Sequence, residues 1–335
     1  MQDEKMDEES LKKVRTGLQR GSRYRHQGGS GLSILKSESR CANRDILTDI
    51  RVRGELTLHH AYVLFAVHTL GHATPNMVRD LLISWKQVDI KKDIREYSSD
   101  AIKTAMRYLA SKGLLLCQAY KADRHMIRVY TITSYGFNIS CSMLDKQGVL
   151  YDVEALYRSE KEIFKHLAVN AVAAEMAKMS GAQEVLFHGR YGGFDKYKIR
   201  EYLYGGVDLD GVLYLMEPTY FRVDEDIETE SESIEKVAKR LLNLPAVCGR
   251  FEEKYQKHVR LVLIVEDSAG ILTLVDILRG LDDPNGIYQS ALITCENIFY
   301  VTGGNLNQVF LRWRYDEKKE KVNLTPYAEN WRQIE

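Results

Sequence analysis

The sequence contains no long apolar run, no paired cysteine motif and no signature of nucleotide or zinc chemistry. No hydrophobic stretch reaches the roughly 18 residues that are needed to cross a bilayer. The five cysteines are scattered and never form a Cys-x-x-Cys pair, which argues against both disulfides and zinc. The chain has no phosphate-binding loop, no His-Glu-x-x-His helix and no Gly-x-Ser-x-Gly turn. We therefore expect neither a cofactor nor the common hydrolase chemistries.

The charge balance divides the chain into two unlike halves. The whole sequence has 47 basic and 47 acidic residues, but residues 1–150 hold 24 Lys and Arg against 16 Asp and Glu. Residues 151–335 hold 23 Lys and Arg against 31 Asp and Glu, so the two halves carry net charges of +8 and −8. A basic half suits a partner with a phosphate backbone, whereas an acidic half indicates a different task. The acidic first residues do not have the form of a signal peptide, so we expect a cytoplasmic protein.

The organisation that we expect has four segments. Residues 1–54 would form a flexible and partly basic tail, and residues 55–150 a small helical domain. Residues 151–315 would form an α/β domain, followed by a C-terminal tail at 316–335. The basic part of the first tail is either an arm along phosphates or an ordinary solvated segment.

Two helices are predicted at the start of the second segment. Residues 58–70 carry apolar side chains at helical spacing and end at Gly71. Thr74 is placed to cap the next helix, and Pro75 stands in its first turn, where a missing N–H costs nothing. Apolar residues at helical spacing after Pro75 predict that the second helix packs on the first.

A third helix and a hairpin complete this segment. Ser98 or Ser99 caps a helix that ends at Gly113, and residues 114–119 and 126–132 alternate like two strands. Helix, helix, helix and hairpin is the order of a winged helix-turn-helix, a fold that usually binds duplex DNA. The sequence therefore predicts double-stranded DNA as the partner.

The candidate DNA-binding residues share the polar face of the third helix or the hairpin: Lys103, Thr104, Arg107, Ser111, Lys121, Arg124 and Arg128. Cations and hydroxyls are the groups that contact phosphate oxygens and base edges. Asp100 is the one acid on this face of the helix. The alternatives are that these charges form only a solvated surface, or that the domain binds protein.

The second half alternates between helix and strand. A capping pattern at Ser159 opens a helix to about Ser180. The other elements that we expect are strands at 184–188, 211–216 and 220–224, a helix at 231–244, a strand at 259–265, a helix at 271–281 and a strand at 298–302. This order favours a mixed sheet flanked by helices, so the whole chain is expected to be α+β.

That order resembles the core of the PD-(D/E)xK nuclease superfamily, in which carboxylates on two strands and a nearby Lys bind a divalent metal. The residues that would correspond to the carboxylates are Asp208, Asp210, Asp224 and Asp226. An Asp stands where the family places its Lys, which leaves the water-activating role empty unless Lys236 or Lys239 on the next helix substitutes. We expect a vestigial site with no bound metal and no catalytic residue. An active metal-dependent nuclease is the weaker alternative.

Residues 55–315 also resemble the replication-relaxation family, the MobC-type accessory proteins of plasmids and conjugative elements. The segments that carry the resemblance are SSDAIKTAMRYLASKGLL (98–115), TITSYG (131–136), HLAVN (166–170), DLDGVLY (208–214) and YFRVDEDIET (220–229). The extended loop at 86–97 and the less basic third helix depart from the family pattern.

The resemblance implies a DNA-binding accessory protein that is not itself an enzyme. Such a protein assists a relaxase or a replication initiator at the origin of a mobile element. Its acidic half would then pair with itself in a homodimer or bind a basic partner. A winged-helix transcriptional repressor would share the first half, so it remains an alternative function.

Overall fold

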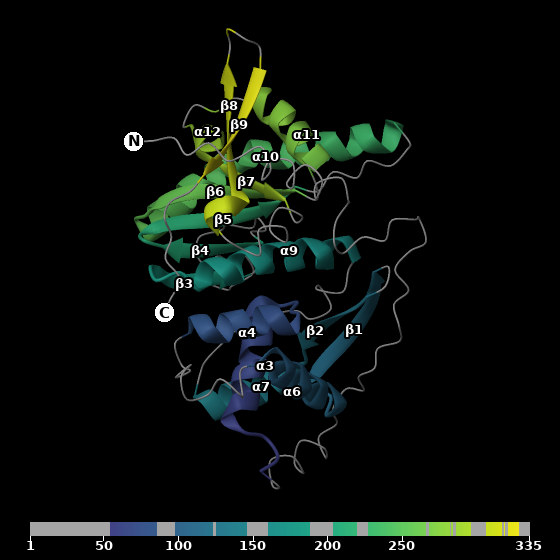
Figure 1. The fold of residues 1–335 in the computed structure, drawn as a ribbon. Coiled ribbons are helices and arrows are strands. Elements are labelled where there is room, and N and C mark those ends of the chain that lie inside the picture. Colours follow the sequence, from purple (N-terminus) through teal and green to yellow (C-terminus); the bar gives the residue numbers. More distant parts are fainter. Residues whose placement is uncertain are drawn as a thin grey trace.

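The computed structural model describes residues 54–85, 98–122, 125–145, 160–187, 204–219, 227–265, 268–281, 283, 286–295, 306–316, 318 and 321–327. The fold is α+β, with helices and a small hairpin first and a seven-stranded mixed sheet after them (Figure 1). The expected N-terminal tail lies almost wholly outside the described residues.

The first half forms a helical unit, which we define as residues 54–145 within the described ranges. Its elements are α3 (Leu58–Leu70), α4 (Pro75–Ser84), α6 (Ser99–Ser111), β1 (Leu115–Ala122), β2 (His125–Ile132) and α7 (Ser134–Leu144). Gly71 ends α3 with a left-handed φ of 68°, and Pro75 begins α4. Ser98 caps α6, because its side chain accepts a hydrogen bond from the backbone of Ala101. The three predicted helices are therefore confirmed, and α7 is an addition to the expected order.

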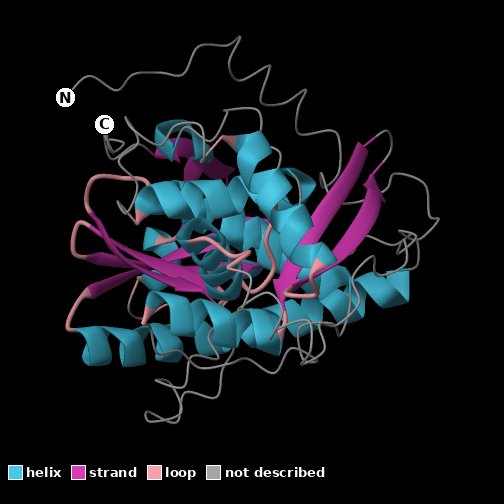
Figure 2. Cartoon of the chain, turned by 90° about the horizontal axis from the view of Figure 1, so that it is seen from below, coloured by secondary structure: helices cyan, strands magenta, loops and turns pink. Residues whose placement is uncertain are grey.

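The hairpin is longer than the sequence suggested. Strands β1 and β2 pair antiparallel from Leu115 opposite Ile132 to Ala122 opposite His125. Lys121, which lies between the strands expected at 114–119 and 126–132, is therefore in a paired strand and not in the connecting loop. Figure 2 shows this hairpin projecting to one side of the helices.

A one-residue bridge joins the turn after α3 to the hairpin. The backbone N–H of Ala73 donates to the carbonyl of Tyr130 at 3.0 Å, and the N–H of Tyr130 donates back at 2.9 Å. Ala73 therefore acts as a minimal third strand beside β2.

The second half is built on a mixed sheet whose strands follow one another in chain order. They are β3 (Ala182–Phe187), β4 (Gly205–Leu209), β5 (Val212–Pro218), β6 (His258–Val265), β7 (Leu292–Cys295), β8 (Phe310–Asp316) and β9 (Lys321–Tyr327). The pairs β5–β6 and β6–β7 are parallel, and the other neighbours are antiparallel. The segment 316–335 is thus not only a tail, because β9 closes the sheet at one edge.

Helices cover the two faces of this sheet. Helix α9 (Glu160–Ala177) packs with side chains of one face, such as Val207 and Tyr214. Helices α10 (Ile227–Tyr255) and α11 (Ser268–Arg279) pack with the opposite face, which carries Leu213 and Leu261. Two short helices, α12 (Ile287–Ser290) and α14 (Leu306–Val309), connect the later strands. The alternation of side chains along each strand accounts for the two separate cores.

Parts of the second half differ from the elements expected there. Helix α10 is longer than the predicted 231–244 and contains Pro245 in its interior. Strand β4 was not expected, because its Gly205 and Gly206 have low strand propensity. The strands expected at 220–224 and 298–302 fall on residues outside the described ranges.

The core on the α9 side of the sheet continues into the helical unit. Leu64 and Val78 of the helical unit belong to the same buried cluster as Leu167 of α9 and Val207 of β4. Figure 1 shows α9 lying between α4 and the sheet. Because α9 contacts both, it joins the helical unit to the sheet.

None of the helices in the described part of the chain combines the length and the apolar character that a membrane span requires.

Candidate nucleic-acid interface

Helix α6 separates its apolar and polar side chains as the sequence predicted. Ile102, Met106 and Leu109 are buried against the other helices. The exposed side chains are those of the predicted polar face: Lys103, Thr104, Arg107 and Ser111. Helix periodicity alone produces this separation, because residues three or four apart share a face.

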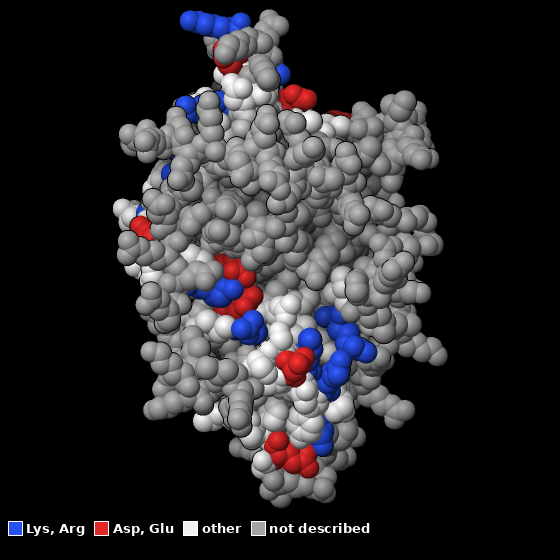
Figure 3. Space-filling view, in the orientation of Figure 1, with Lys and Arg blue, Asp and Glu red and all other residues white. Residues whose placement is uncertain are grey.

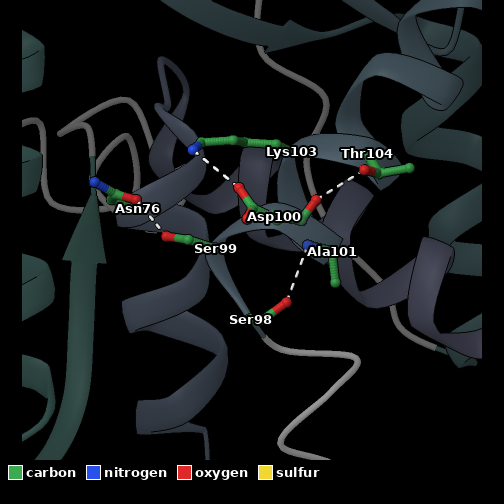
Figure 4. Close-up of polar contacts among 7 residues, drawn as sticks. All are labelled: Asn76, Ser98, Ser99, Asp100, Ala101, Lys103 and Thr104. Atoms are coloured by element: carbon green, nitrogen blue, oxygen red, sulfur yellow. Dashed lines mark hydrogen bonds and ion pairs between the residues drawn. The ribbon is translucent and has the colours of Figure 1, made fainter.

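The first turn of α6 holds a compact set of polar contacts (Figure 4). The Lys103 ammonium lies 3.2 Å from the carboxylate of Asp100, whose side chain is 92% exposed. The Thr104 hydroxyl donates to the backbone carbonyl of Asp100 at 2.8 Å. Ser99 donates to the side-chain oxygen of Asn76 at 2.8 Å, which ties the first turns of α6 and α4 together. Lys103 is therefore partly neutralised, and the Thr104 proton is already committed.

Arg107 differs from its neighbours on this face. It is exposed, and among the described residues it makes no ion pair with a carboxylate. The Ser111 hydroxyl, one turn further on, donates to the carbonyl of Tyr108 at 2.7 Å. Arg107 is thus the side chain of α6 with the greatest capacity to bind an incoming anion.

Positive charges on two elements, Arg107 of α6 and Arg128 of β2, act on the buried Tyr130 hydroxyl. Burial raises the pKa of the Tyr130 hydroxyl, and the Cys117 thiol beside it adds to this effect. The positive charges of Arg128 and Arg107 lower the same pKa, so both lie within electrostatic range of Tyr130. Figure 3 shows Lys and Arg side chains gathered over α6 and the hairpin. We call the surface formed by Lys103, Arg107 and Arg128 the α6–β2 face.

The remaining candidate residues of the hairpin are only partly placed. Lys121 is in β1 opposite Met126, and its side chain lies outside the described part of the structure. Arg124, in the connection between the strands, lies outside it altogether. The α6–β2 face is therefore defined without these two residues.

Asp208 has a structural partner in the sheet. It lies on β4 between Val207 and Leu209, which point to the α9 side, so its own side chain points to the other face. The carboxylate is buried and forms an ion pair with the Lys257 ammonium, just before β6. A carboxylate held this way is neutralised within the fold and is poorly placed to bind a metal.

Asp210 is a turn residue. Leu209 pairs with Val212, so Asp210 and Gly211 form a two-residue turn between β4 and β5. Both have a positive φ, 54° and 79°, as a type I′ turn requires. Asp-Gly between two strands is a strong hairpin signal, and it is the feature that would have revealed β4 in the sequence.

The closeness of Asp210 and Asp224, which the nuclease resemblance implies, stays a prediction. Among the described strands, β5 pairs with β4 on one side and β6 on the other. Asp224 and Asp226 themselves lie outside the described residues. Within the described part of the chain, no three His, Cys, Asp or Glu residues are close enough to hold a metal ion.

The sequence did not reveal the contacts that join α9 to the helical unit. The side-chain nitrogen of Asn170 donates to the carbonyls of Leu70 and His72, both at 2.7 Å. Lys178 lies 3.4 Å from Asp80 of α4 and 2.7 Å from Glu175 of α9. A lone Asn or Lys on an amphipathic helix gives no local sign of such a long-range contact.

Comparisons of this chain with protein-family models, with curated proteins and with solved structures find no match.

Proposed function

We propose that the helical unit is a winged helix that binds duplex DNA through the α6–β2 face. Support comes from the order α3, Ala73 bridge, α4, α6, β1 and β2, which is that of a winged helix-turn-helix. In this arrangement α6 enters the major groove and the hairpin contacts the adjacent backbone.

The observation that carries this proposal is the exposed polar face of α6, which presents Lys103, Thr104, Arg107 and Ser111. Strand β2 of the adjoining hairpin adds Arg128, which is half-exposed. Arginine forms bidentate contacts with phosphate oxygens, so Arg107 and Arg128 suit the DNA backbone.

For the second half we propose a scaffold rather than an enzyme. The order α9, β3, β4, β5, α10 and β6 resembles the nuclease core. However, Asp208 is engaged by Lys257, and Asp210 occupies a turn. Both observations support a fold of nuclease type that has lost its metal-binding role.

The biological role that we propose is that of an accessory protein at the origin of a plasmid or conjugative element. It would bind the origin duplex and assist a relaxase or a replication initiator, as the family resemblance implies. A footprint on the origin of the element supports this role. A footprint confined to the promoter of its own gene would instead identify a transcriptional repressor.

The direct test of DNA binding uses the double variant Arg107→Ala/Arg128→Ala with fluorescently labelled duplex. Its charge-matched control is Lys236→Ala/Lys239→Ala, which removes two exposed cations from α10. We expect the first variant to bind at least tenfold more weakly and the control to bind like the wild type. The slope of log affinity against log salt should become shallower by about 0.9 for each phosphate that the variant no longer neutralises. Equal affinities for the two variants would contradict the assignment of the α6–β2 face.

A further inference from the structure

Asn170 of α9 joins the sheet-bearing half, residues 160–327 within the described ranges, to the turn between α3 and α4. Its side chain is fully buried on α9. The two protons of its amide nitrogen go to the carbonyls of Leu70 and His72, both at 2.7 Å. Only a donor with two protons can satisfy both carbonyl oxygens at once. The Leu70 carbonyl also accepts from the backbone N–H of His72 at 2.8 Å, so removing the Asn170 amide takes one hydrogen bond from each carbonyl, and losing a buried hydrogen bond is costly.

The same turn is bonded to β2. Ala73 follows His72 and exchanges two backbone hydrogen bonds with Tyr130, at 3.0 and 2.9 Å. The Nδ1 atom of His72 also lies 3.1 Å from the hydroxyl of Thr131. The turn is therefore hydrogen-bonded to two consecutive residues of β2, Tyr130 and Thr131, and Asn170 is hydrogen-bonded to the turn.

β2 in turn carries one side of the α6–β2 face. Arg128 is two residues before Tyr130, so both side chains project from the same face of the strand. A continuous series of hydrogen bonds thus runs from α9, through the turn, to β2, the strand that carries Arg128.

We propose that Asn170 is a positioning residue through which the sheet-bearing half sets the place of Arg128 on the DNA-binding surface. The inference rests on the proposed function and names the regulation of the same site. A partner that shifts α9 changes the position of the turn, and thereby the affinity of the helical unit for duplex DNA. The second half controls DNA binding without touching the DNA.

The variant that tests this coupling is Asn170→Ala in the full chain, with Asn170→Ser as a milder form. The matched control is Val172→Ala, which truncates another buried side chain of α9. Val172 is two residues further along the helix, about 200° around the axis from Asn170, and so lies on the opposite side from the turn. All variants are compared well below their unfolding temperatures.

Two measurements separate positioning from general destabilisation. We expect Asn170→Ala to speed hydrogen exchange at the amides of Ala73 and Tyr130, and Asn170→Ser to do so less. We also expect the duplex affinity of Asn170→Ala to fall by roughly 3- to 30-fold. The slope of its log affinity against log salt should become shallower by about 0.9, because the phosphate contact of Arg128 is lost. Val172→Ala should leave exchange at these two amides and the salt slope unchanged.

Equal exchange and equal affinity in the Asn170 variants and Val172→Ala would overturn the coupling. Failure of the wild type to bind any duplex would overturn the proposed function instead. In that case the exchange rates at Ala73 and Tyr130 still decide whether Asn170 positions β2.

Discussion

Lys178 lies 3.4 Å from Asp80 and so links the end of α9 to α4 across the boundary between the two halves. Glu175 lies 2.7 Å from the same ammonium group. Two carboxylates thus share one cation in a largely buried place. Burial, the largest cause, raises the pKa of both Asp80 and Glu175, and Lys178 only partly opposes it.

This arrangement predicts a pH dependence of stability with a definite sign. A carboxyl whose pKa is higher in the folded state than in the unfolded state favours folding most when it is protonated. Its contribution is therefore full below the ordinary values of 3.8 and 4.5 and is lost as the pH rises through the raised values. Asp80→Asn cannot ionise, so its melting temperature relative to the wild type should increase between pH 4 and pH 7.

Thermal unfolding monitored by circular dichroism across this pH range checks the prediction. Glu235→Gln is a suitable control, because Glu235 is exposed on α10 and its hydrogen bond with Lys239 lowers its pKa. The melting temperature of Glu235→Gln relative to the wild type should decrease slightly between pH 4 and pH 7. A difference between Asp80→Asn and the wild type that stays constant with pH would contradict the interpretation.

Single substitutions on α6 should differ in their effect on duplex binding. Lys103 is already paired with Asp100, whereas Arg107 is not paired among the described residues. Arg107→Ala should cost about 1–3 kcal/mol if the side chain reads a base, and Lys103→Ala should cost less. A gel-shift titration of Lys103→Ala, Arg107→Ala and the double variant Lys103→Ala/Arg107→Ala measures which substitution weakens duplex binding more. A greater loss for Lys103→Ala would show that the Asp100 contact does not weaken its role.

Asp100 should weaken the binding of duplex DNA, whatever the base sequence of the duplex. Its carboxylate is almost fully exposed at the start of α6, close to where a phosphate or a base edge would approach. Asp100→Asn removes the repulsion and releases Lys103, so affinity for random duplex should rise several-fold, with a steeper salt dependence. Binding measured by anisotropy at several salt concentrations tests this. Reduced affinity confined to one base pair would instead show that Asp100 reads a cytosine amino group.

Two glycines should respond oppositely to alanine. A Cβ atom at Gly136 in α7 would lie 2.2 Å from the backbone oxygen of Leu114, so Gly136→Ala should destabilise the fold by about 1–3 kcal/mol. Gly249 is inside α10 with nothing within 4 Å of a new Cβ atom, so Gly249→Ala should stabilise it by about 0.5–1 kcal/mol. Chemical denaturation gives both values. The same sign for both would contradict the packing described at Gly136.

Metal ions should not make the protein a nuclease. Asp208 is paired with Lys257 and Asp210 is needed for the turn, so neither carboxylate is offered to a cation. We expect the wild type to leave supercoiled plasmid intact in Mg²⁺ or Mn²⁺ and to bind duplex without either. Agarose gels of wild type and Asp210→Ala, beside a metal-dependent nuclease as a positive control, check this. Nicking by the wild type that Asp210→Ala abolishes would restore the nuclease hypothesis.

Local signals in the sequence determined the helices of the first half. Gly71, Pro75 and Ser98 mark helix boundaries through their own backbone preferences and side-chain oxygens, which act within one turn. The exposure of Arg107 followed equally from helical periodicity. The place of α9 and the apolar strand β6 could also be predicted, because their patterns extend over many residues.

Contacts between distant residues were decided only by the tertiary structure. The strand β4 is short and begins with two glycines, so its pairing with β3 and β5 supplies what its own propensity lacks. The ion pair of Asp208 with Lys257 joins residues 49 positions apart. The hydrogen bonds of Asn170 to the carbonyls of Leu70 and His72 join residues that are 100 and 98 positions apart. Side-chain type and local spacing determine which segments form helices, whereas the partner of a buried polar group depends on which surfaces the packed core brings together.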